Sequence, residues 1–352
     1  MNQILRKINR FVNKIEIVLG KTRLFSYPRN VQIEPTNRCN QRCIMCPRNT
    51  KLDVPIGNMD FNTFKRILDK LPAVENLLLN GLGEPLLNKE LPEMIAYASY
   101  KGIRVSINSN CALIDEPLAK KLVESGLHLL KISMDSADPK IYKAIRGASL
   151  EPTIKGIKTL VRTREEKRSF RPQLWFNSII MRNNYKNLDE ILILGDKLKI
   201  DLVRFKPINT LWSGQNNNSA IEKKDLEKEV ERGIELGRSL NVKHNLGDLL
   251  ERLKADIYQR PKENIPCYSP WTELYIQYYG GVRLCCEFYS KKDDIGNILE
   301  EDFKKIWNGK KIRQIRREFK RGNTYLSACR SCNRFQKNIL LYNKIKKFRI
   351  YV

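Results

Sequence analysis

The feature that most constrains the fold of this chain is an alternation of strand-like and helix-like segments between residues 31 and 206. The expected strands are Val31–Pro35, Asn76–Asn80, Ile103–Asn108, Leu129–Met134, Leu174–Ile180 and Leu202–Phe205, and the expected helices are 61–70, 91–100, 116–125, 151–164 and 188–198. Successive βα steps require a parallel sheet, because each crossover returns the chain to the same edge direction. The pattern stops near Phe205, so we expect an α/β fold with a partial, open (β/α)6 TIM-like barrel.

The segments outside the barrel differ from it in composition. We divide the chain into a basic amphipathic N-terminal helix (1–30), the barrel (31–208), a linker and charged helix (209–262), a small cysteine-rich domain (263–335) and a basic C-terminal tail (336–352). The cysteine-rich domain has little regular apolar pattern, so we expect bound metal to stabilise it.

Cysteine and histidine usage limits the chemistry of the chain. Its 352 residues include nine cysteines and two histidines, and no apolar run is long enough to cross a bilayer. The N-terminus has no small-residue cleavage site of the secretory kind, so we expect a cytoplasmic protein whose thiols are reduced. The cysteines are therefore expected to bind metal, and chemistry built on histidine pairs or triads is not favoured.

Positive charge is concentrated at the two ends of the chain. The net charge is +26, of which residues 1–30 carry +6 and residues 303–352 carry +15. The N-terminal helix has two interpretations: it packs on the body through its apolar stripe, or it lies on an anionic membrane surface. A dense basic run, 310–321, is expected on another helix. Nucleic acid is not favoured as a partner, because aromatic residues of the stacking kind are not interleaved with these charges.

The first cysteine cluster directly follows the first expected strand. Cys39, Cys43 and Cys46 have the spacing Cys-x3-Cys-x2-Cys. Three thiolates from one short loop can hold three irons of a cubane cluster, which leaves the fourth iron open for another molecule. Zinc is the alternative, but it prefers four protein ligands in a closed site and no fourth Cys or His is nearby.

This loop, placed after strand one of a partial barrel, resembles the radical S-adenosylmethionine (SAM) superfamily. The resemblance implies a [4Fe–4S] cluster at the three cysteines, whose open iron binds the amino and carboxylate groups of SAM. It also implies that electron transfer into the sulfonium releases a 5′-deoxyadenosyl radical, which abstracts hydrogen from a substrate. A reductant such as flavodoxin or ferredoxin is implied as a partner.

Further residues match the superfamily's cofactor-contacting positions in order along the chain. Gly81-Leu-Gly83-Glu84-Pro85 is similar to its GGEP element, and polar residues close the third and fourth strands. The cofactor-binding residues that the resemblance implies are Met45, Gly81, Gly83, Glu84, Pro85, Asn108, Ser133, Asp135 and Arg146. The position of Met45 is often aromatic in the superfamily, and the third strand ends in Asn108-Ser-Asn-Cys111 where Asn-Gly is common. Cys111 is either a small buried residue or a catalytic thiol that donates hydrogen.

The second cysteine cluster resembles the C-terminal SPASM/twitch region of many radical SAM enzymes, over about residues 265–335. The implied ligands of one closed auxiliary [4Fe–4S] cluster are Cys267, Cys285, Cys329 and Cys332. No cysteine follows Cys332, which is why one auxiliary cluster is expected where larger SPASM domains hold two. Tetrahedral zinc is again the alternative at this site.

Two classes of function agree with these features. The first is a radical SAM oxidoreductase that dehydrogenates a small or lipid-linked substrate, with epimerisation through Cys111 or peptide modification as alternatives. Thirty residues before the barrel are too few for the peptide-recognition domain of many peptide-modifying relatives. The second class is a non-catalytic zinc-binding or nucleic-acid-binding protein, which would leave the element at 81–85 and the strand-end polar residues unexplained.

Overall fold

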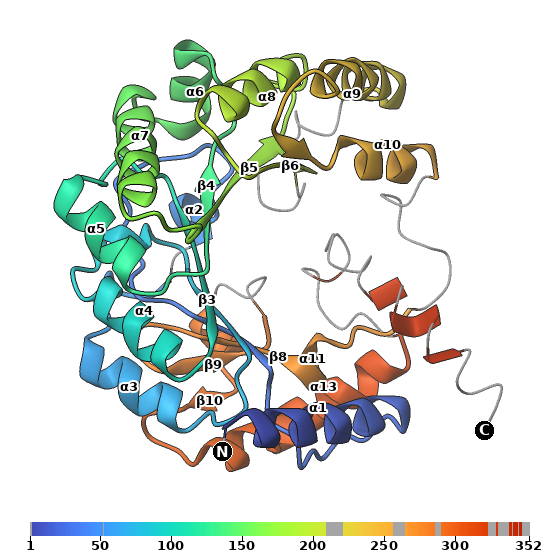
Figure 1. The fold of residues 1–352 in the computed structure, drawn as a ribbon. Coiled ribbons are helices and arrows are strands. Elements are labelled where there is room, and N and C mark those ends of the chain that lie inside the picture. The colour runs from blue at the N-terminus through green and yellow to red at the C-terminus, as the bar shows by residue number, and fades with distance from the viewer. Residues whose placement is uncertain are drawn as a thin grey trace.

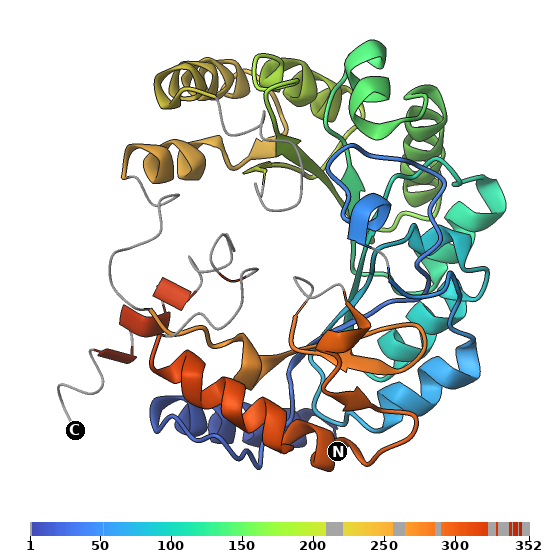
Figure 2. The same ribbon diagram turned by 180° about the vertical axis from the view of Figure 1, so that it is seen from behind.

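The computed structural model describes residues 2–51, 53–208, 221–255, 265–285 and 290–322, together with Cys329 and a few positions between 338 and 346. Its centre is one 10-stranded sheet with the strand order β10-β9-β8-β1-β2-β3-β4-β5-β6-β7. The sheet curls into an open barrel, and helices cover its outer, convex face (Figures 1 and 2).

The six barrel strands agree with the sequence prediction to within about two residues at each end. They are β1 (Asn30–Ile33), β2 (Asn76–Leu79), β3 (Arg104–Ser109), β4 (Leu129–Ser133), β5 (Gln173–Ile180) and β6 (Leu202–Pro207). Neighbouring strands are parallel, with Val31 opposite Leu77 and Lys131 opposite Trp175. The predicted partial barrel is therefore confirmed.

The barrel helices follow the strands in alternation. They are α2 (Arg48–Lys51), α3 (Phe61–Asp69), η1 (Pro85–Leu87), α4 (Leu91–Tyr100), α5 (Glu116–Glu124), α6 (Pro139–Arg146), α7 (Glu151–Glu166) and α8 (Leu188–Lys197). Aspartates cap the first turns of three of them: the carboxylates of Asp60, Asp115 and Asp138 accept hydrogen bonds from backbone N–H groups of α3, α5 and α6. Local sequence thus sets where these helices begin.

Burial alternates along the barrel strands. In β6, Val203 and Phe205 are buried in the core between the sheet and its helices, whereas Leu202, Arg204 and Lys206 are partly exposed. Because successive side chains point to opposite faces of a strand, the partly exposed residues lie on the inner, concave face. This face, together with the carboxyl ends of the strands, is where function gathers in barrels of this kind.

The C-terminal region joins the same sheet, which the sequence pattern did not indicate. After α9 (Lys223–Gly237), β7 (Lys243–His244) and α10 (Leu246–Lys254), the chain forms α11 (Ser269–Thr272), β8 (Glu273–Ile276), β9 (Gly281–Arg283), η2 (Lys291–Asp293), β10 (Gly296–Asn297), α12 (Phe303–Trp307) and α13 (Lys310–Lys320). Strand β8 pairs in parallel with β1. The cysteine-rich region is thus built onto the barrel edge next to the first cysteine loop.

Helix α1 (Asn2–Val18) corrects one sequence interpretation. Of the two alternatives, packing on the body through the apolar stripe is wrong: Ile8 and Phe11 are exposed, while Asn9 and Asn13 are buried. The predicted basic helix over 310–321 is confirmed as α13. In the part of the chain that the structure describes, no helix is both long and apolar enough to span a bilayer.

Candidate functional site

The first three cysteines share one loop at the carboxyl end of β1. Cys43 is buried, Cys39 and Cys46 are partly exposed, and none of the three is disulfide-bonded. The backbone N–H of Cys46 donates to the carbonyl of Cys43 at 3.1 Å, and that of Ile44 donates to Ile145 in α6 at 2.9 Å. The loop is therefore folded on itself and also fixed to the barrel.

The element at 81–85 packs directly against this loop. A Cβ atom on Gly83 would overlap the carbonyl oxygens of Thr36 and Arg38, and the backbone N–H of Glu84 donates to Arg38 at 2.7 Å. A Cβ on Gly81 would overlap the Glu34 carboxylate. Only glycine permits this approach at both positions, so the pattern Gly-x-Gly sets the distance between the loop and the second strand.

Glu84 links the ends of β2 and β3. Its buried carboxylate accepts hydrogen bonds from the backbone N–H groups of Asn110 at 2.8 Å and Leu86 at 3.2 Å. Burial raises its pKa to about 7, although these hydrogen bonds oppose the rise. The Asn110 side chain in turn donates to the side chain of Asn40, inside the cysteine loop, at 2.8 Å.

Arg146 places a positive charge beside the cysteine loop. Its Nη2 lies 2.5 Å from Asp135 Oδ2, and its Nη1 lies 3.6 Å from Cys43 Sγ. Asp135 is held in place through Oδ1, which accepts from the backbone N–H of Ile179 in β5 at 2.7 Å. Burial opposes the charge on Arg146, but Asp135 and Cys43 outweigh burial and raise its pKa. The structure thus brings Asp135 and Arg146 together next to the thiols.

Burial favours the protonated state of two of the three thiols, Cys39 and Cys46. Burial raises the pKa of Cys39 to about 11, and nearby Glu84, Cys43 and Cys46 add to the rise. Burial also raises the pKa of Cys46. Iron binding must therefore displace protons from this loop.

The remaining predicted cofactor and catalytic residues have different surroundings. Asn108 and Ser133 lie on the concave face, and the buried Oδ1 of Asn108 has no hydrogen-bond partner among the described residues. Met45 and Pro85 lie within the loop and the 81–85 element. Cys111 is fully buried in the core and has φ 60°, and burial raises its pKa. These surroundings favour the packing role of Cys111 over the catalytic one.

The second cysteine cluster is described in part. Cys267 precedes α11, Cys285 follows β9, and both pack against the core, as does Cys329. Cys332, the fourth predicted ligand, lies outside the described residues. Within those residues, no three or more His, Cys, Asp or Glu side chains are arranged to hold a single metal ion.

Sequence reasoning missed four cations at inward positions of the barrel strands, of which Arg104, at the amino end of β3, donates to Asn76. Lys131 in β4 and Arg204 and Lys206 in β6 alternate with buried core residues. The inward positions of β1–β6, all of them described, contain no Asp or Glu, and in the neighbouring strand β8 Glu273 lies opposite the inward residue Asn30. The signal was present in the sequence: each cation occupies the alternate position of a strand whose other positions are apolar.

Two family models match the chain. The radical SAM superfamily model matches residues 33–192, and the iron–sulfur cluster-binding domain model named SPASM matches residues 267–333. Curated relatives include a tungsten-containing aldehyde ferredoxin oxidoreductase cofactor-modifying protein of Pyrococcus furiosus, which is 26% identical over 86% of this chain and 86% of its own. An Fe-coproporphyrin III synthase of Methanosarcina barkeri is 27% identical over 77% of this chain and 71% of its own.

Solved structures share the fold. Streptococcus suis SuiB, crystallised with the precursor peptide SuiA, has a TM-score of 0.66 at 17% identity and covers 91% of this chain and 72% of its own. A structure described as native anSMEcpe with bound AdoMet has a TM-score of 0.62 at 19% identity and covers 88% of this chain and 87% of its own.

The chain is therefore an enzyme of the radical SAM superfamily. More specifically, it combines the partial radical SAM barrel with a C-terminal SPASM domain, and its cofactors are a [4Fe–4S] cluster, an auxiliary cluster and SAM. Enzymes of this superfamily need a reductant.

Proposed function

We propose that this enzyme abstracts a hydrogen atom from an anionic substrate, small or lipid-linked, and that the net reaction is a dehydrogenation. One observation carries the proposal: a loop with three cysteines, packed against Gly83 and Arg146, follows the carboxyl end of β1 in a sheet whose strands β4 and β6 carry cations on the concave face. With both cofactors bound, the loop supplies a 5′-deoxyadenosyl radical as the hydrogen-abstracting species.

The residues of the site have separate tasks in this proposal. Cys39, Cys43 and Cys46 hold the cluster, while Glu84 fixes the ends of β2 and β3 around the space next to it. Asn108 offers an unpartnered oxygen as a hydrogen-bond acceptor for the cofactor. The Asp135–Arg146 pair places a guanidinium group 3.6 Å from Cys43 Sγ, which orients this thiol within the loop.

The proposal that the substrate is anionic is based on three cations of the concave face: Lys131, Arg204 and Lys206. They lie within two strand spacings of one another, about 10 Å across the sheet, which long side chains bridge easily. Each already has at least one polar, ionic or ring contact in the structure, so the argument rests on their placement and charge. Phosphate or carboxylate is the chemistry that such a group of cations recognises.

Dehydrogenation requires the substrate radical to lose one proton and one electron. The auxiliary cluster expected at Cys267, Cys285, Cys329 and Cys332 is suited to accept that electron, because a closed cluster has no open iron for substrate. Epimerisation with Cys111 as donor is less favoured, since Cys111 is fully buried. Two relatives are named as synthases of Fe-coproporphyrin III and of heme, and one structural neighbour was crystallised with a precursor peptide. Tetrapyrroles and peptides therefore belong among the substrates of the first assays.

The first test is reductive SAM cleavage by the anaerobically reconstituted enzyme. With dithionite as reductant we expect 5′-deoxyadenosine, and none from the Cys39→Ala/Cys43→Ala/Cys46→Ala variant. An iron-loaded enzyme that forms no 5′-deoxyadenosine under any reductant would contradict the radical mechanism.

The substrate class is tested separately with pyrophosphate as a probe anion and calorimetry on the holoenzyme. We expect Lys131→Met/Arg204→Gln/Lys206→Met to bind it at least about tenfold more weakly, since each charge-assisted hydrogen bond contributes roughly 1.5–3 kcal/mol. The matched control, Lys120→Met/Lys155→Met/Arg238→Gln, removes the same charges from exposed helix positions. Equal binding by both variants would reject the anionic class without affecting the radical assignment.

A further inference from the structure

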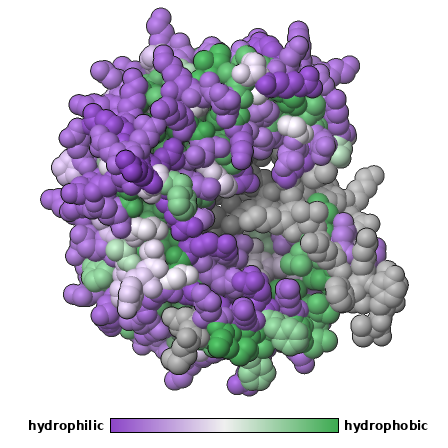
Figure 3. All heavy atoms as spheres, viewed as in Figure 1, coloured by the Kyte–Doolittle hydropathy of each residue, from purple (hydrophilic) through white to green (hydrophobic). Residues whose placement is uncertain are grey.

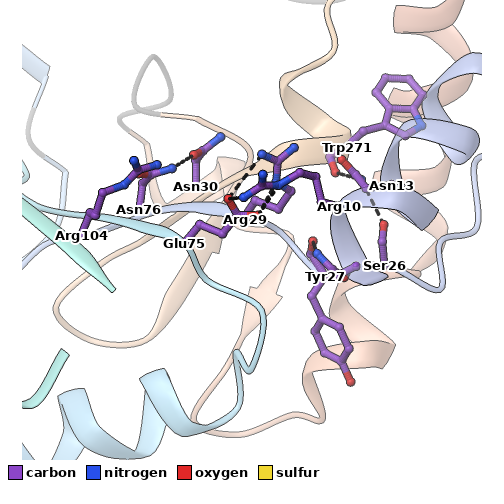
Figure 4. A network of polar contacts seen from close by, with 11 residues as sticks. Arg10, Asn13, Ser26, Tyr27, Arg29, Asn30, Glu75, Asn76, Arg104 and Trp271 are labelled. Atoms are coloured by element: carbon purple, nitrogen blue, oxygen red, sulfur yellow. Dashed lines mark hydrogen bonds and ion pairs between the residues drawn. The ribbon is translucent and has the colours of Figure 1, made fainter. Parts of the chain in front are cut away.

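Helix α1 is attached to the body mainly through polar side chains, while Ile17 and Val18 pack on the core at its C-terminal end. Asn13 is fully buried, and its Nδ2 donates to Ser26 Oγ at 3.0 Å and to the Trp271 carbonyl at 2.8 Å (Figure 4). Asn9 exchanges two hydrogen bonds with the backbone of Tyr27, and Arg10 pairs with Glu75 at 2.6 Å. The orientation of α1 is thus fixed by several specific hydrogen bonds.

This attachment leaves the apolar side of α1 facing outward. We define the apolar stripe as Ile4, Leu5, Ile8, Phe11, Ile15 and Leu19, whose side chains are between 39% and 67% exposed. Phe25, in the loop after the helix, is 84% exposed. Figure 3 shows apolar side chains gathered over α1 at the lower edge of that face. A contiguous exposed apolar patch of this kind marks an interaction surface.

Cations surround the apolar stripe. Lys7, Lys14, Lys21 and Arg23 are all exposed, whereas Glu16, the one acid among the first 30 residues, is buried. Helix α13 runs beside α1 in both ribbon views, and Arg316 donates to the Thr22 carbonyl at 2.9 Å. The exposed cations of α13 are Lys310, Lys311, Arg313, Arg317 and Lys320.

We propose that α1 and α13 form a docking surface for an anionic lipid bilayer. The apolar stripe enters the headgroup region with the helix lying in the membrane plane, and the surrounding cations contact lipid phosphates. A second copy of the chain fits this surface poorly, because a two-fold contact through α1 brings the same cations together without exposed acids from residues 1–30 to pair with them.

The docking surface lies away from the cysteine loop. Arg6 of α1 donates to the carbonyls of Lys101 and Gly102, just before β3, and Arg10 pairs with Glu75, just before β2. Helix α1 therefore lies at the amino ends of the strands, opposite the carboxyl ends that hold the site. Membrane binding and SAM cleavage are thus separable, and the inference does not depend on the proposed reaction.

The test is flotation of the holoenzyme with lipid vesicles in a density gradient. Vesicles containing about 30 mol% phosphatidylglycerol in phosphatidylcholine are compared with pure phosphatidylcholine. We expect wild type to float with the anionic vesicles, and Ile8→Ser/Phe11→Ser/Ile15→Ser to lose at least about tenfold in apparent affinity. Lys7→Gln/Lys14→Gln should weaken binding less, and about 0.5 M salt should weaken it for the wild type.

The matched control is Phe170→Ser/Ile193→Ser, which removes two exposed apolar side chains outside α1 and its contacts. It should float like wild type, and every variant should keep its iron content and uncoupled SAM cleavage. The proposal is overturned if wild type does not float, or if it floats equally well with neutral vesicles. It is also overturned if the control loses as much vesicle affinity as the α1 variant. Concentration-dependent dimerisation abolished by the α1 variant, without flotation, would assign the surface to a second copy instead.

Discussion

The cysteine loop and helix α1 lie at opposite ends of β1, and both are held to the barrel by polar contacts. The loop is fixed mainly by its backbone: Gly83 lets the 81–85 element approach closely, and backbone hydrogen bonds tie the loop to α6. Helix α1 is fixed by buried side chains, above all Asn13. The loop therefore presents thiols to its ligand, whereas α1 presents the apolar stripe to its surroundings.

The difference shows how polar anchoring decides what a segment exposes. Amide and carboxylate side chains that form several buried hydrogen bonds inside the protein can orient a helix against its hydrophobic pattern. Close backbone contact at a glycine can likewise fix the position of a loop. Because such contact does not use the side chains of the loop, those side chains stay available to bind a ligand.

Replacing Gly83 with alanine should have the largest effect on the loop. The new Cβ would overlap two backbone carbonyls that cannot move aside, so the loop must shift and the thiol geometry with it. We expect loss of the first cluster and of SAM cleavage by about a hundredfold or more. Iron content and 5′-deoxyadenosine formation measure this.

The control for this substitution is Gly247→Ala in α10, where an added Cβ meets nothing within 4 Å. It should stabilise the protein by up to about 1 kcal/mol and leave iron binding unchanged. Full cluster occupancy in Gly83→Ala would show that close approach at this position is not required.

A pair of substitutions in α1 tests the inverted packing directly. Asn13→Leu increases apolarity but leaves buried partners unsatisfied, so we expect a loss of about 2–3 kcal/mol in unfolding free energy. Phe11→Ser, on the exposed side, should change it by less than about 0.5 kcal/mol. Urea unfolding of both variants decides the matter. The opposite ranking would mean that the apolar stripe is the buried face in solution.

Glu75→Gln should lower the free energy of unfolding by less than Asn13→Leu does. The carboxylate pairs with Arg10 at 2.6 Å and Arg29 at 2.8 Å, but both arginines are partly exposed, so we expect a loss of about 1–2 kcal/mol. The fully exposed pair of Arg162 and Glu116 supplies the comparison: Glu116→Gln should cost no more than about 0.5 kcal/mol. If urea unfolding shows equal losses of unfolding free energy in Glu75→Gln and Glu116→Gln, Glu75 has no special role in anchoring α1.

The pH dependence of cluster assembly should show the smallest effect. The pKa of Cys39 is raised to about 11 and that of Cys46 is also raised, so both thiols are protonated in the metal-free protein. Iron binding displaces these protons and is therefore favoured as pH rises. Limiting-iron reconstitution should give a few-fold higher occupancy at about pH 8.5 than at about pH 6.5. Cluster occupancy that falls with rising pH would contradict the prediction that iron binding displaces protons from Cys39 and Cys46.

Sequence reasoning placed the barrel and the cysteine loop well, because both follow from local patterns. The strands alternate with helices, and capping residues such as Asp60 and Asp138 mark where helices begin. It failed where partners are distant in sequence. The packing of α1 depends on Trp271 and Glu75, and the pairing of β8 with β1 joins segments more than 240 residues apart.

The cations of the concave face show a second limit of prediction from the sequence. Lys131 and Arg204 occupy inward positions that alternation predicts, but only the sheet order shows that they share one face near the site. The roles of Cys111 and Arg146 also depended on surroundings that single-sequence patterns do not contain. Burial of Cys111 and the contact of Arg146 with Cys43 became visible only in three dimensions.

The central claim is that the three-cysteine loop holds an open cluster and that a second cluster is held independently. Its most direct test is iron and sulfide content, with electron paramagnetic resonance, on anaerobically reconstituted wild type and Cys39→Ala/Cys43→Ala/Cys46→Ala. We predict about eight irons in wild type and about four in the variant, with a SAM-sensitive signal in wild type alone. Zinc in place of iron, or an unchanged iron count in the variant, would contradict the account.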